Sequence, residues 1–292
     1  MEKPAGEELQ ERIREEIASL CSGQDNSLGD ASTERAWGGP MVGFARGDDP
    51  LFDVFKAQIG PFYWTPEEAF ALAYPEEDVC AEQLGVLSYL LPQTEATRRD
   101  QKAQQRFPAE RWTRSRFFGE RFNQAMRAEL VQRLHGLGYQ ALAPELLPGW
   151  ARRQSESLGL ASNWSERHTA HACGLGTFGL SDGLITPAGK AVRFGSVVIR
   201  ARFAPSPRPY DNHRAWCLYF ARGTCGLCIG RCPVSAIDEG GHDKERCSRY
   251  IREETTPYSL SRYGIEVNNC GLCQVGIPCE SRIPPSLAPK AS

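Results

Sequence analysis

The sequence predicts a mixed fold of helices and strands in two parts, an α/β (α+β) domain followed by a smaller cysteine-rich domain. Three observations predict this division. Residues 1–203 alternate helical apolar periodicity with short buried-strand patterns, which is typical of layered domains. Pro205, Pro207 and Pro209 then interrupt the chain, and eight of the eleven cysteines follow within residues 217–279. We therefore expect one domain at 1–205 and a second at 206–292.

Bulk composition excludes several classes of protein. The chain of 292 residues is 41% hydrophobic and 24% charged, which is ordinary for a globular protein, and its net charge of −2 argues against a nucleic-acid coat. No apolar run approaches the roughly 18 residues that indicate a membrane span. The N-terminus lacks the apolar segment of a signal peptide. We expect a cytoplasmic protein with reduced thiols and no membrane partner.

The N-terminal half begins with two helix signals separated by loop. Residues 7–20 place Leu9, Ile13 and Ile17 at helical spacing. Residues 22–50 are rich in Gly, Asp, Asn and Ser, which predicts a loop. Thr65-Pro-Glu-Glu68 has the composition of a capping box with proline at the first helical position, so a helix should start there and end before Pro75.

Further along, apolar runs and helical stripes alternate. Residues 95–127 also carry nine Lys or Arg against four Asp or Glu, which indicates a solvated helical face or a patch for an anionic partner. The remaining elements that we expect in the larger domain are a strand at 85–91, a helix at 115–137, a strand at 139–143, a helix at 166–173 capped by Asn163 or Ser165, and a strand at 194–203.

A glycine-rich loop follows the helix at 166–173. Gly174, Gly176 and Gly179 formally match the G-x-G-x-x-G dinucleotide fingerprint. That fingerprint requires a strand before the loop and a helix after it, and here a helix leads in. We therefore disfavour a dinucleotide site and expect a loop in which glycines let the backbone approach a large ligand.

The cysteines form the strongest motif. Cys225, Cys228 and Cys232-Pro form a C-x2-C-x3-C-P run, which is typical of ferredoxins with two four-iron clusters. In such runs the cysteine before proline ligates the other cluster. This crossover predicts two sets of four ligands. Cys232, Cys247, Cys270 and Cys273 would hold one 4Fe-4S cluster, and Cys217, Cys225, Cys228 and Cys279 would hold the other.

Two spacings depart from the ferredoxin pattern, and both affect the second set. Arg222 stands where the first cysteine of the run is usual, so we assign that ligand to Cys217. Five residues separate Cys273 from Cys279, where three are usual. Zinc bound by two C-x2-C pairs is an alternative, although it leaves Cys232-Pro unexplained. Disulfides are a second alternative, disfavoured because nothing looks secretory.

Two stretches together resemble a known family. Residues 167–187, continuing to 193–197, and the cysteine module at 217–279 resemble the epoxyqueuosine reductase and reductive dehalogenase superfamily. The resemblance implies a nitroreductase-related domain that holds a corrinoid (cobalamin) against one cluster, followed by a ferredoxin-like domain. Electrons would pass from an external donor (ferredoxin, flavodoxin or a reductase) through both clusters to the corrinoid. The substrate would be a small molecule or a modified nucleoside.

By the same resemblance, the glycine loop and the turn after it should line the corrinoid pocket. FMN is an alternative occupant, since the implied fold also holds flavin. The residues expected along the pocket are Gly174, Gly176, Thr177, Phe178, Gly179, Ile185, Thr186 and Pro187.

The proton donor does not follow from the resemblance. Leu160 stands where the reductases carry an acid, and the chain ends before the helical-repeat tail that some of them use for tRNA. We therefore expect a divergent member with another substrate, and we disfavour a nucleic-acid partner without excluding one. His168, His171 and Asp182 are candidate donors, because histidine near its usual pKa suits general acid catalysis. The two histidines are equally interpretable as capping or core residues.

The sequence thus predicts a cytoplasmic iron–sulfur reductase that uses two 4Fe-4S clusters and a corrinoid. An electron carrier or corrinoid-activating protein without substrate chemistry of its own is one alternative. A flavin-dependent iron–sulfur reductase is another.

Overall fold

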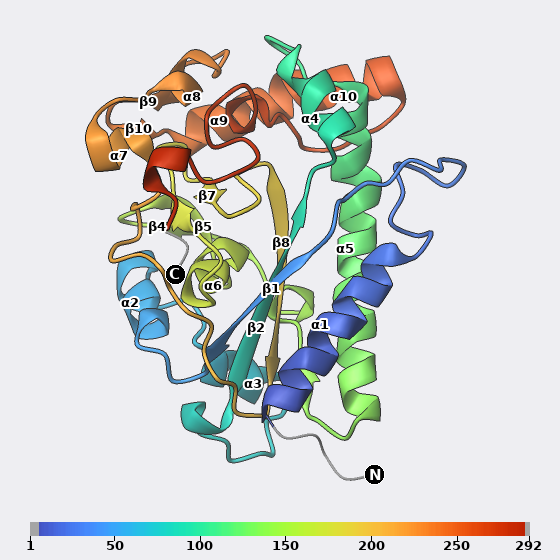
Figure 1. The fold of residues 1–292 in the computed structure, drawn as a ribbon, viewed down its shortest axis with the longest axis vertical. Helices are drawn as coiled ribbons and strands as arrows, with labels where there is room; N and C mark the ends of the chain where they lie inside the picture. The colour runs from blue at the N-terminus through green and yellow to red at the C-terminus, as the bar shows by residue number, and fades with distance from the viewer. Residues whose placement is uncertain (1–5, 290–292) are drawn as a thin grey trace.

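A four-stranded antiparallel sheet forms the centre of the larger domain in the computed structural model, which describes residues 6–289 (Figure 1). The order is β1 (Met41–Arg46), β2 (Gly85–Pro92), β8 (Val192–Ile199), β3 (Ala141–Leu142). β2 and β8 pair over their full lengths, from Gly85 opposite Ile199 to Pro92 opposite Val192. All pairings in this sheet are antiparallel, so the predicted mixed fold is of the α+β class rather than the α/β class.

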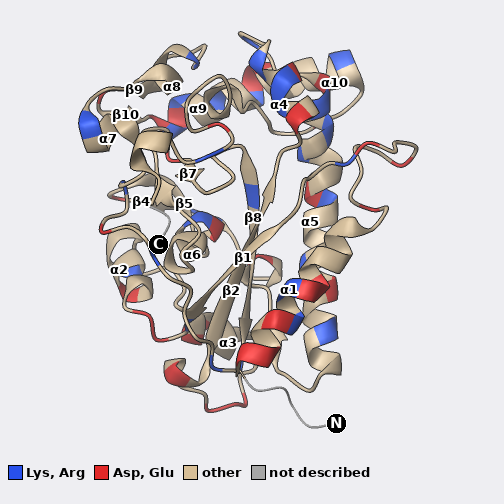
Figure 2. Cartoon of the chain, viewed as in Figure 1, with Lys and Arg blue, Asp and Glu red and all other residues tan. Residues whose placement is uncertain are grey.

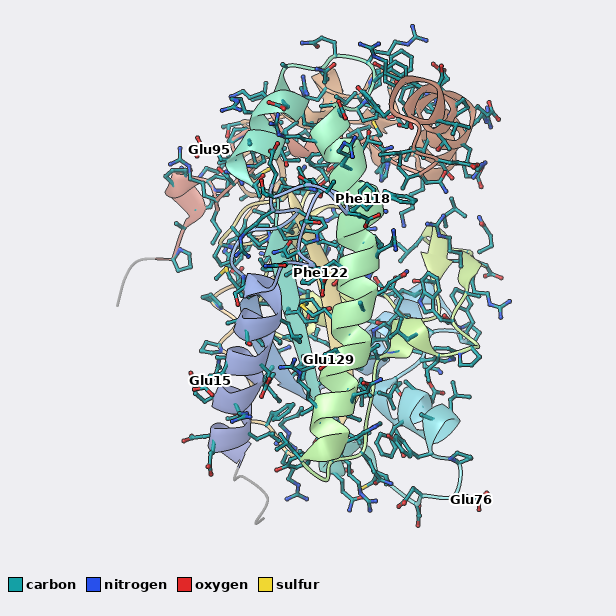
Figure 3. All side chains as sticks on the ribbon, turned by 90° about the vertical axis from the view of Figure 1, so that its right-hand side faces the viewer. Glu15, Glu76, Glu95, Phe118, Phe122 and Glu129 are labelled. Carbon is teal, nitrogen blue, oxygen red and sulfur yellow. The ribbon has the colours of Figure 1, made fainter. Side chains whose placement is uncertain are left out.

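Helices cover both faces of the sheet. On one face α1 (Gly6–Ser22) and α5 (Glu110–Gly136) lie side by side (Figure 3) and pack Ile13 and Phe122 against Leu87 of β2. On the other face α2 (Leu51–Ile59), α3 (Pro66–Ala73) and α6 (Glu166–Ala172) surround Val86 and Trp164. Consecutive residues of β2 point to opposite faces, so an almost wholly apolar strand serves both cores.

The cysteine-rich domain lies over the end of the sheet where β8 begins (Figure 1). The other elements are α4 (Glu95–Lys102), β4 (Arg152–Ser155), β5 (Gly159–Ser162), β6 (Thr177–Phe178), β7 (Leu184–Ile185), α7 (Leu218–Arg222), α8 (Leu227–Gly230), β9 (Ile237–Asp238), β10 (Gly241–His242), α9 (Lys244–Tyr250), α10 (Thr256–Tyr263) and single helical turns at Ala81–Gln83, Pro144–Leu146, Ile251–Thr255, Leu272–Gln274 and Pro285–Leu287.

Most predicted elements are confirmed. Thr65 and Glu68 form the expected capping box, with the Glu68 N–H donating to Thr65 Oγ1 at 3.3 Å. The strand expected at 139–143 shortens to two residues. The loop prediction for 22–50 is wrong at Met41–Arg46, which forms β1 against β2. Pairing with a strand some forty residues away outweighs the weak local pattern there.

The two parts of the chain are packed against each other. Gln101 of α4 donates to the Cys270 carbonyl at 2.6 Å, and Trp112 of α5 packs with Val275 of the cysteine-rich domain. Gly271 has φ +71°, and a Cβ there would lie 2.1 Å from the Trp112 ring. The boundary near residue 205 therefore separates two sequence regions that share a packed interface.

The basic segment at 95–127 is largely paired with acids. Both basic and acidic residues lie on α4 and α5 (Figure 2). Arg111 binds Glu34 at 2.7 Å and also pairs with Asp100, and Arg114 binds Glu110 at 2.9 Å. These contacts favour the solvated helical face over a free patch. None of the helices between residues 6 and 289 has the length and apolar character needed to cross a bilayer.

Candidate functional site

Cys232, Cys247, Cys270 and Cys273 come together as one cluster of thiols, here called the inner group. Cys247 lies on α9, and Cys270 and Cys273 flank the start of the turn at Leu272–Gln274. Every pair of the four interacts electrostatically. Burial raises the pKa of both Cys247 and Cys270 to about 12. Thiolates at such a place require a strong positive charge among them, which a metal centre supplies.

Cys217, Cys225, Cys228 and Cys279, here called the outer group, line a single cavity. Apolar Leu180 and Ile185 close this cavity on the side of the α/β domain. Burial raises the pKa of Cys228 to about 11. The structure thus places the predicted cysteines near one another, and their division into two sets of four stays a prediction, since Cys228 also interacts with Cys273.

Backbone N–H groups point toward sulfur atoms of the inner group. The Ala236 N–H donates to Cys232 Sγ at 3.2 Å, and the Leu272 backbone hydrogen-bonds the Cys270 side chain. N–H groups aimed at sulfur are among the contacts that tune iron–sulfur clusters, so this environment fits a cluster. Between residues 6 and 289 no three His, Cys, Asp or Glu side chains converge as ligands of one metal ion.

The unusual cysteine spacings have structural explanations. Cys217 precedes α7, and Arg222 ends that helix, where its guanidinium donates to the Ser286 carbonyl at 2.7 Å. Position 222 therefore anchors the C-terminal segment. The long link from Cys273 to Cys279 is packed through buried Val275, and its Gly276 adopts φ +71°.

The glycine loop is shaped by the chain's own packing. A Cβ on Gly174, which has φ +80°, would lie 2.5 Å from the Pro207 carbonyl oxygen. A Cβ on Gly176 would lie 2.4 Å from the Ile185 carbonyl oxygen. Gly179 lines the outer-group cavity. These contacts explain the glycines without a ligand, which differs from the reason that we expected.

The other residues expected along a corrinoid pocket are mostly engaged internally. The Thr177 hydroxyl accepts from the Trp216 N–H at 3.0 Å, and the Thr186 hydroxyl donates to the Gly189 carbonyl at 2.7 Å. Phe178 is half-buried, and Pro187 is exposed. Five of the eight residues are buried, and their place along a corrinoid pocket stays a prediction.

His168 and His171 are packed into the interior side of α6. His168 bonds to the Ser165 hydroxyl at 2.8 Å and packs against Phe55 and Phe178. Burial, with the nearby Arg167 charge, lowers the pKa of His168 to about 3. His171 donates from Nδ1 to the Gly176 carbonyl at 2.7 Å, and burial also lowers its pKa. Both imidazoles are neutral near pH 7, which favours the core interpretation over proton donation.

Asp182 lies at the contact between the glycine loop and the cysteine-rich domain. Its carboxylate is 3.2 Å from His242 Nδ1 and 3.8 Å from Lys244 Nζ. Burial opposes its ionisation, but the hydrogen bond from His242 and the Lys244 and Arg167 charges outweigh burial and lower its pKa. An ionised carboxylate is an acceptor at neutral pH, so Asp182 is suited to fixing this contact rather than to donating a proton.

A buried ionic network escaped the sequence analysis. Arg127 of α5, whose side chain is 1% exposed, lies 2.5 Å from Glu145 and 3.7 Å from Glu166 at the start of α6. Burial raises the pKa of Glu166 to about 7, and the Arg127 charge opposes that rise. The available signal was a polar pair, Asn123 and Arg127, four residues apart in the apolar stripe of α5.

Three further arginines keep part of their surface open to solvent beside this network. Arg116 and Arg193 share one carboxylate, that of Glu120, and their mutual repulsion together with burial lowers the pKa of Arg116 to about 10. Arg167 is exposed, and its guanidinium donates to the Asp182 carbonyl at 2.7 Å. Arg167 also interacts with Cys247 and Cys273. The charge of Arg167 therefore lies beside the inner group.

The comparisons with known proteins bear on the fold. No family model matches the sequence, and no curated protein matches it. A catabolic reductive dehalogenase solved with 3-bromo-4-hydroxybenzoic acid superposes with a TM-score of 0.50 at 16% identity, over 94% of this chain and 37% of the dehalogenase. Epoxyqueuosine reductase from Bacillus subtilis gives a TM-score of 0.49 at 16% identity, over 97% of this chain and 68% of the reductase.

The dehalogenase match shows that this chain has the same fold over most of its length. The fold that the resemblance implied is thereby confirmed. The chain spans little more than a third of the dehalogenase, so the activity of that larger protein does not transfer with the fold.

Proposed function

We propose that the protein is an iron–sulfur oxidoreductase in which two 4Fe-4S clusters carry electrons from an external donor into the α/β domain. The observation that carries this proposal is the gathering of the eight predicted cysteines in one region, which we divide into two groups of four. The two groups adjoin, because Cys228 of the outer group interacts electrostatically with Cys273 of the inner group. Two clusters held this way would stand next to each other.

The surroundings of the two groups support a direction for the electrons. A groove lined by Leu218, Cys225 and Leu227 adjoins the outer-group cavity, and Leu227 is 55% exposed. A ferredoxin, flavodoxin or reductase would deliver electrons at this surface. The inner group lies beside Arg167 of α6 and would pass them into the α/β domain.

A corrinoid is the electron acceptor that we propose, with FMN as the alternative. A bound corrinoid would supply a cobalt centre for reductive chemistry. Support comes from the fold shared with a reductive dehalogenase and not from the glycine-loop residues, which are packed. The exposed Arg167 favours a small-molecule or modified-nucleoside substrate that carries negative charge.

A second candidate is an electron carrier or corrinoid-activating protein with no substrate chemistry of its own. The packing of Gly174 and Gly176 against the chain favours this reading, because it explains both glycines without a cofactor. The neutral His168 and ionised Asp182 favour it too, since neither is suited to donate a proton near pH 7.

A metal and cofactor inventory on protein purified without air tests these proposals. We expect about eight irons per chain with the broad visible absorption of iron–sulfur clusters. Zinc without iron would refute the proposal. Cobalt retained after reconstitution with cobalamin would support the corrinoid over FMN, and turnover of a substrate without a protein partner would count against the carrier.

A further inference from the structure

Lys190 is a buried cation between the two cysteine groups. The residue is 3% exposed and lines the outer-group cavity. Its ammonium group interacts electrostatically with the outer Cys217, Cys228 and Cys279 and with the inner Cys273. One positive charge therefore faces sulfur atoms from both groups.

The ammonium group has sulfur rather than carboxylate around it. Its hydrogen bond goes to the Ser181 hydroxyl at 2.8 Å, and Ser181 also hydrogen-bonds the Cys273 side chain. In the part of the chain from 6 to 289, no ion pair joins Lys190 to Asp or Glu. A buried charge without a partner is strongly unfavourable, so negative charge on the sulfurs must compensate it.

The backbone fixes the position of this cation. The Lys190 N–H donates to the Cys279 carbonyl at 2.8 Å, which ties the residue to an outer-group cysteine. Gly183 makes room for the aliphatic part of the side chain, because a Cβ there would lie 2.6 Å from Lys190 Cδ. Both contacts direct the side chain inward between the groups.

We propose that Lys190 is the counter-charge that raises the reduction potentials of the two clusters, so that both accept electrons from the donor. This inference rests on the proposed function. Each cluster gains one electron and hence one negative charge when it is reduced. A fixed positive charge in a site of low polarity stabilises that added charge, and it does so for both clusters because it lies between them. Lys190 is a positioning residue here, because it acts through the clusters.

Redox titration of the anaerobically purified full-length protein, followed by electron paramagnetic resonance, tests the role. Lys190→Met removes the charge and keeps a long side chain. We expect at least a tenfold loss in the equilibrium constant for reduction of one or both clusters, a shift of about 59 mV to lower potential for a one-electron couple. Lys190→Arg should retain most of the wild-type potential. Lys56→Met, which removes a lysine paired with Glu68 at 2.6 Å, is the control and should shift neither potential.

The outcomes separate this inference from the proposed function. Wild-type protein without iron–sulfur clusters would remove both. Wild-type clusters whose potentials do not change in Lys190→Met would overturn only the role of Lys190. If Lys190→Met fails to hold iron, Lys190→Gln and Lys190→Arg decide the matter. If Lys190→Arg retains iron and Lys190→Gln loses it, a positive charge is required at this position. If both variants lose iron equally, or if Lys190→Gln retains clusters with wild-type reduction potentials, the proposed role of Lys190 is overturned.

Discussion

The contact between the two parts of the chain is most sharply tested at Gly189. This residue has φ +81°, and a Cβ there would lie 2.4 Å from the backbone of Glu280 and Ser281. Backbone atoms cannot leave by a change of rotamer, so in Gly189→Ala either the turn or the segment at 279–281 must move. We expect the variant to destabilise the protein and to release iron.

The magnitude follows from two additive costs. An L-residue in the left-handed region costs about 1–2 kcal/mol. Forcing an extra methyl group into a packed contact costs about 1–3 kcal/mol more. Moving the segment away instead breaks hydrogen bonds from the N–H groups of Lys190 and Ala191 to the carbonyls of Cys279 and Glu280, each worth about 1 kcal/mol. Either route predicts a loss of about 2–5 kcal/mol.

Gly264→Ala is the matched control. Gly264 ends α10 with φ +68°, and no atom lies within 4 Å of the position that a Cβ would take. Gly264→Ala should therefore lower the free energy of unfolding only by the strain of an L-residue in the left-handed region, about 1–2 kcal/mol. Chemical denaturation measures the free energy of unfolding, and iron analysis should show that Gly189→Ala loses outer-group iron because Cys279 moves. Equal losses of stability and iron in the two variants would refute the reasoning.

Two further predictions concern ligands and pH. Cys217→Ser should lower the iron content by about one cluster, and full iron in this variant would remove Cys217 from the proposed ligands. Cys232→Ala should remove the inner cluster and spare the outer one, and loss of the outer cluster instead would contradict the assignment. The wild-type free energy of unfolding should fall as the pH drops below about 6.5. In that range His168 is protonated in the unfolded chain and stays neutral in the folded protein, where its pKa is about 3, so protonation favours unfolding. His168→Asn, which can still bond Ser165, should reduce this dependence by at most about 5 kcal/mol. An unchanged acid limb in urea titrations would contradict a half-buried, neutral His168.

The gathering of the cysteines was predictable because a C-x2-C-x3-C-P run is a local pattern with a known structural meaning. In a C-x2-C-x3-C-P run the chain geometry itself directs the third sulfur away from the first two. The same holds for the helix start at Thr65, where cap and helix lie within four residues. In both cases the interacting atoms are near neighbours in the sequence.

The features that the sequence did not reveal depend on distant contacts. β1 exists because Met41–Arg46 meets β2, and Arg127 is charged inside an apolar stripe because Glu145 and Glu166 reach it from other elements. Lys190 stands just before an apolar strand and has no local pattern that marks it. Its significance arises only when cysteines from about 27 to 89 positions further along the chain surround it.

The position of Lys190 also explains why the cysteine module departs from ferredoxin spacing only on one side. The inner group is built almost wholly from the cysteine-rich domain, so its spacings can remain regular. The outer-group cavity is closed by Leu180, Ile185 and Lys190 from the α/β domain, and Cys279 must reach that domain to hydrogen-bond Lys190. The longer link to Cys279 and the helix after Cys217 provide that reach. The altered spacings are therefore best understood as the cost of fitting a cluster site against a second domain.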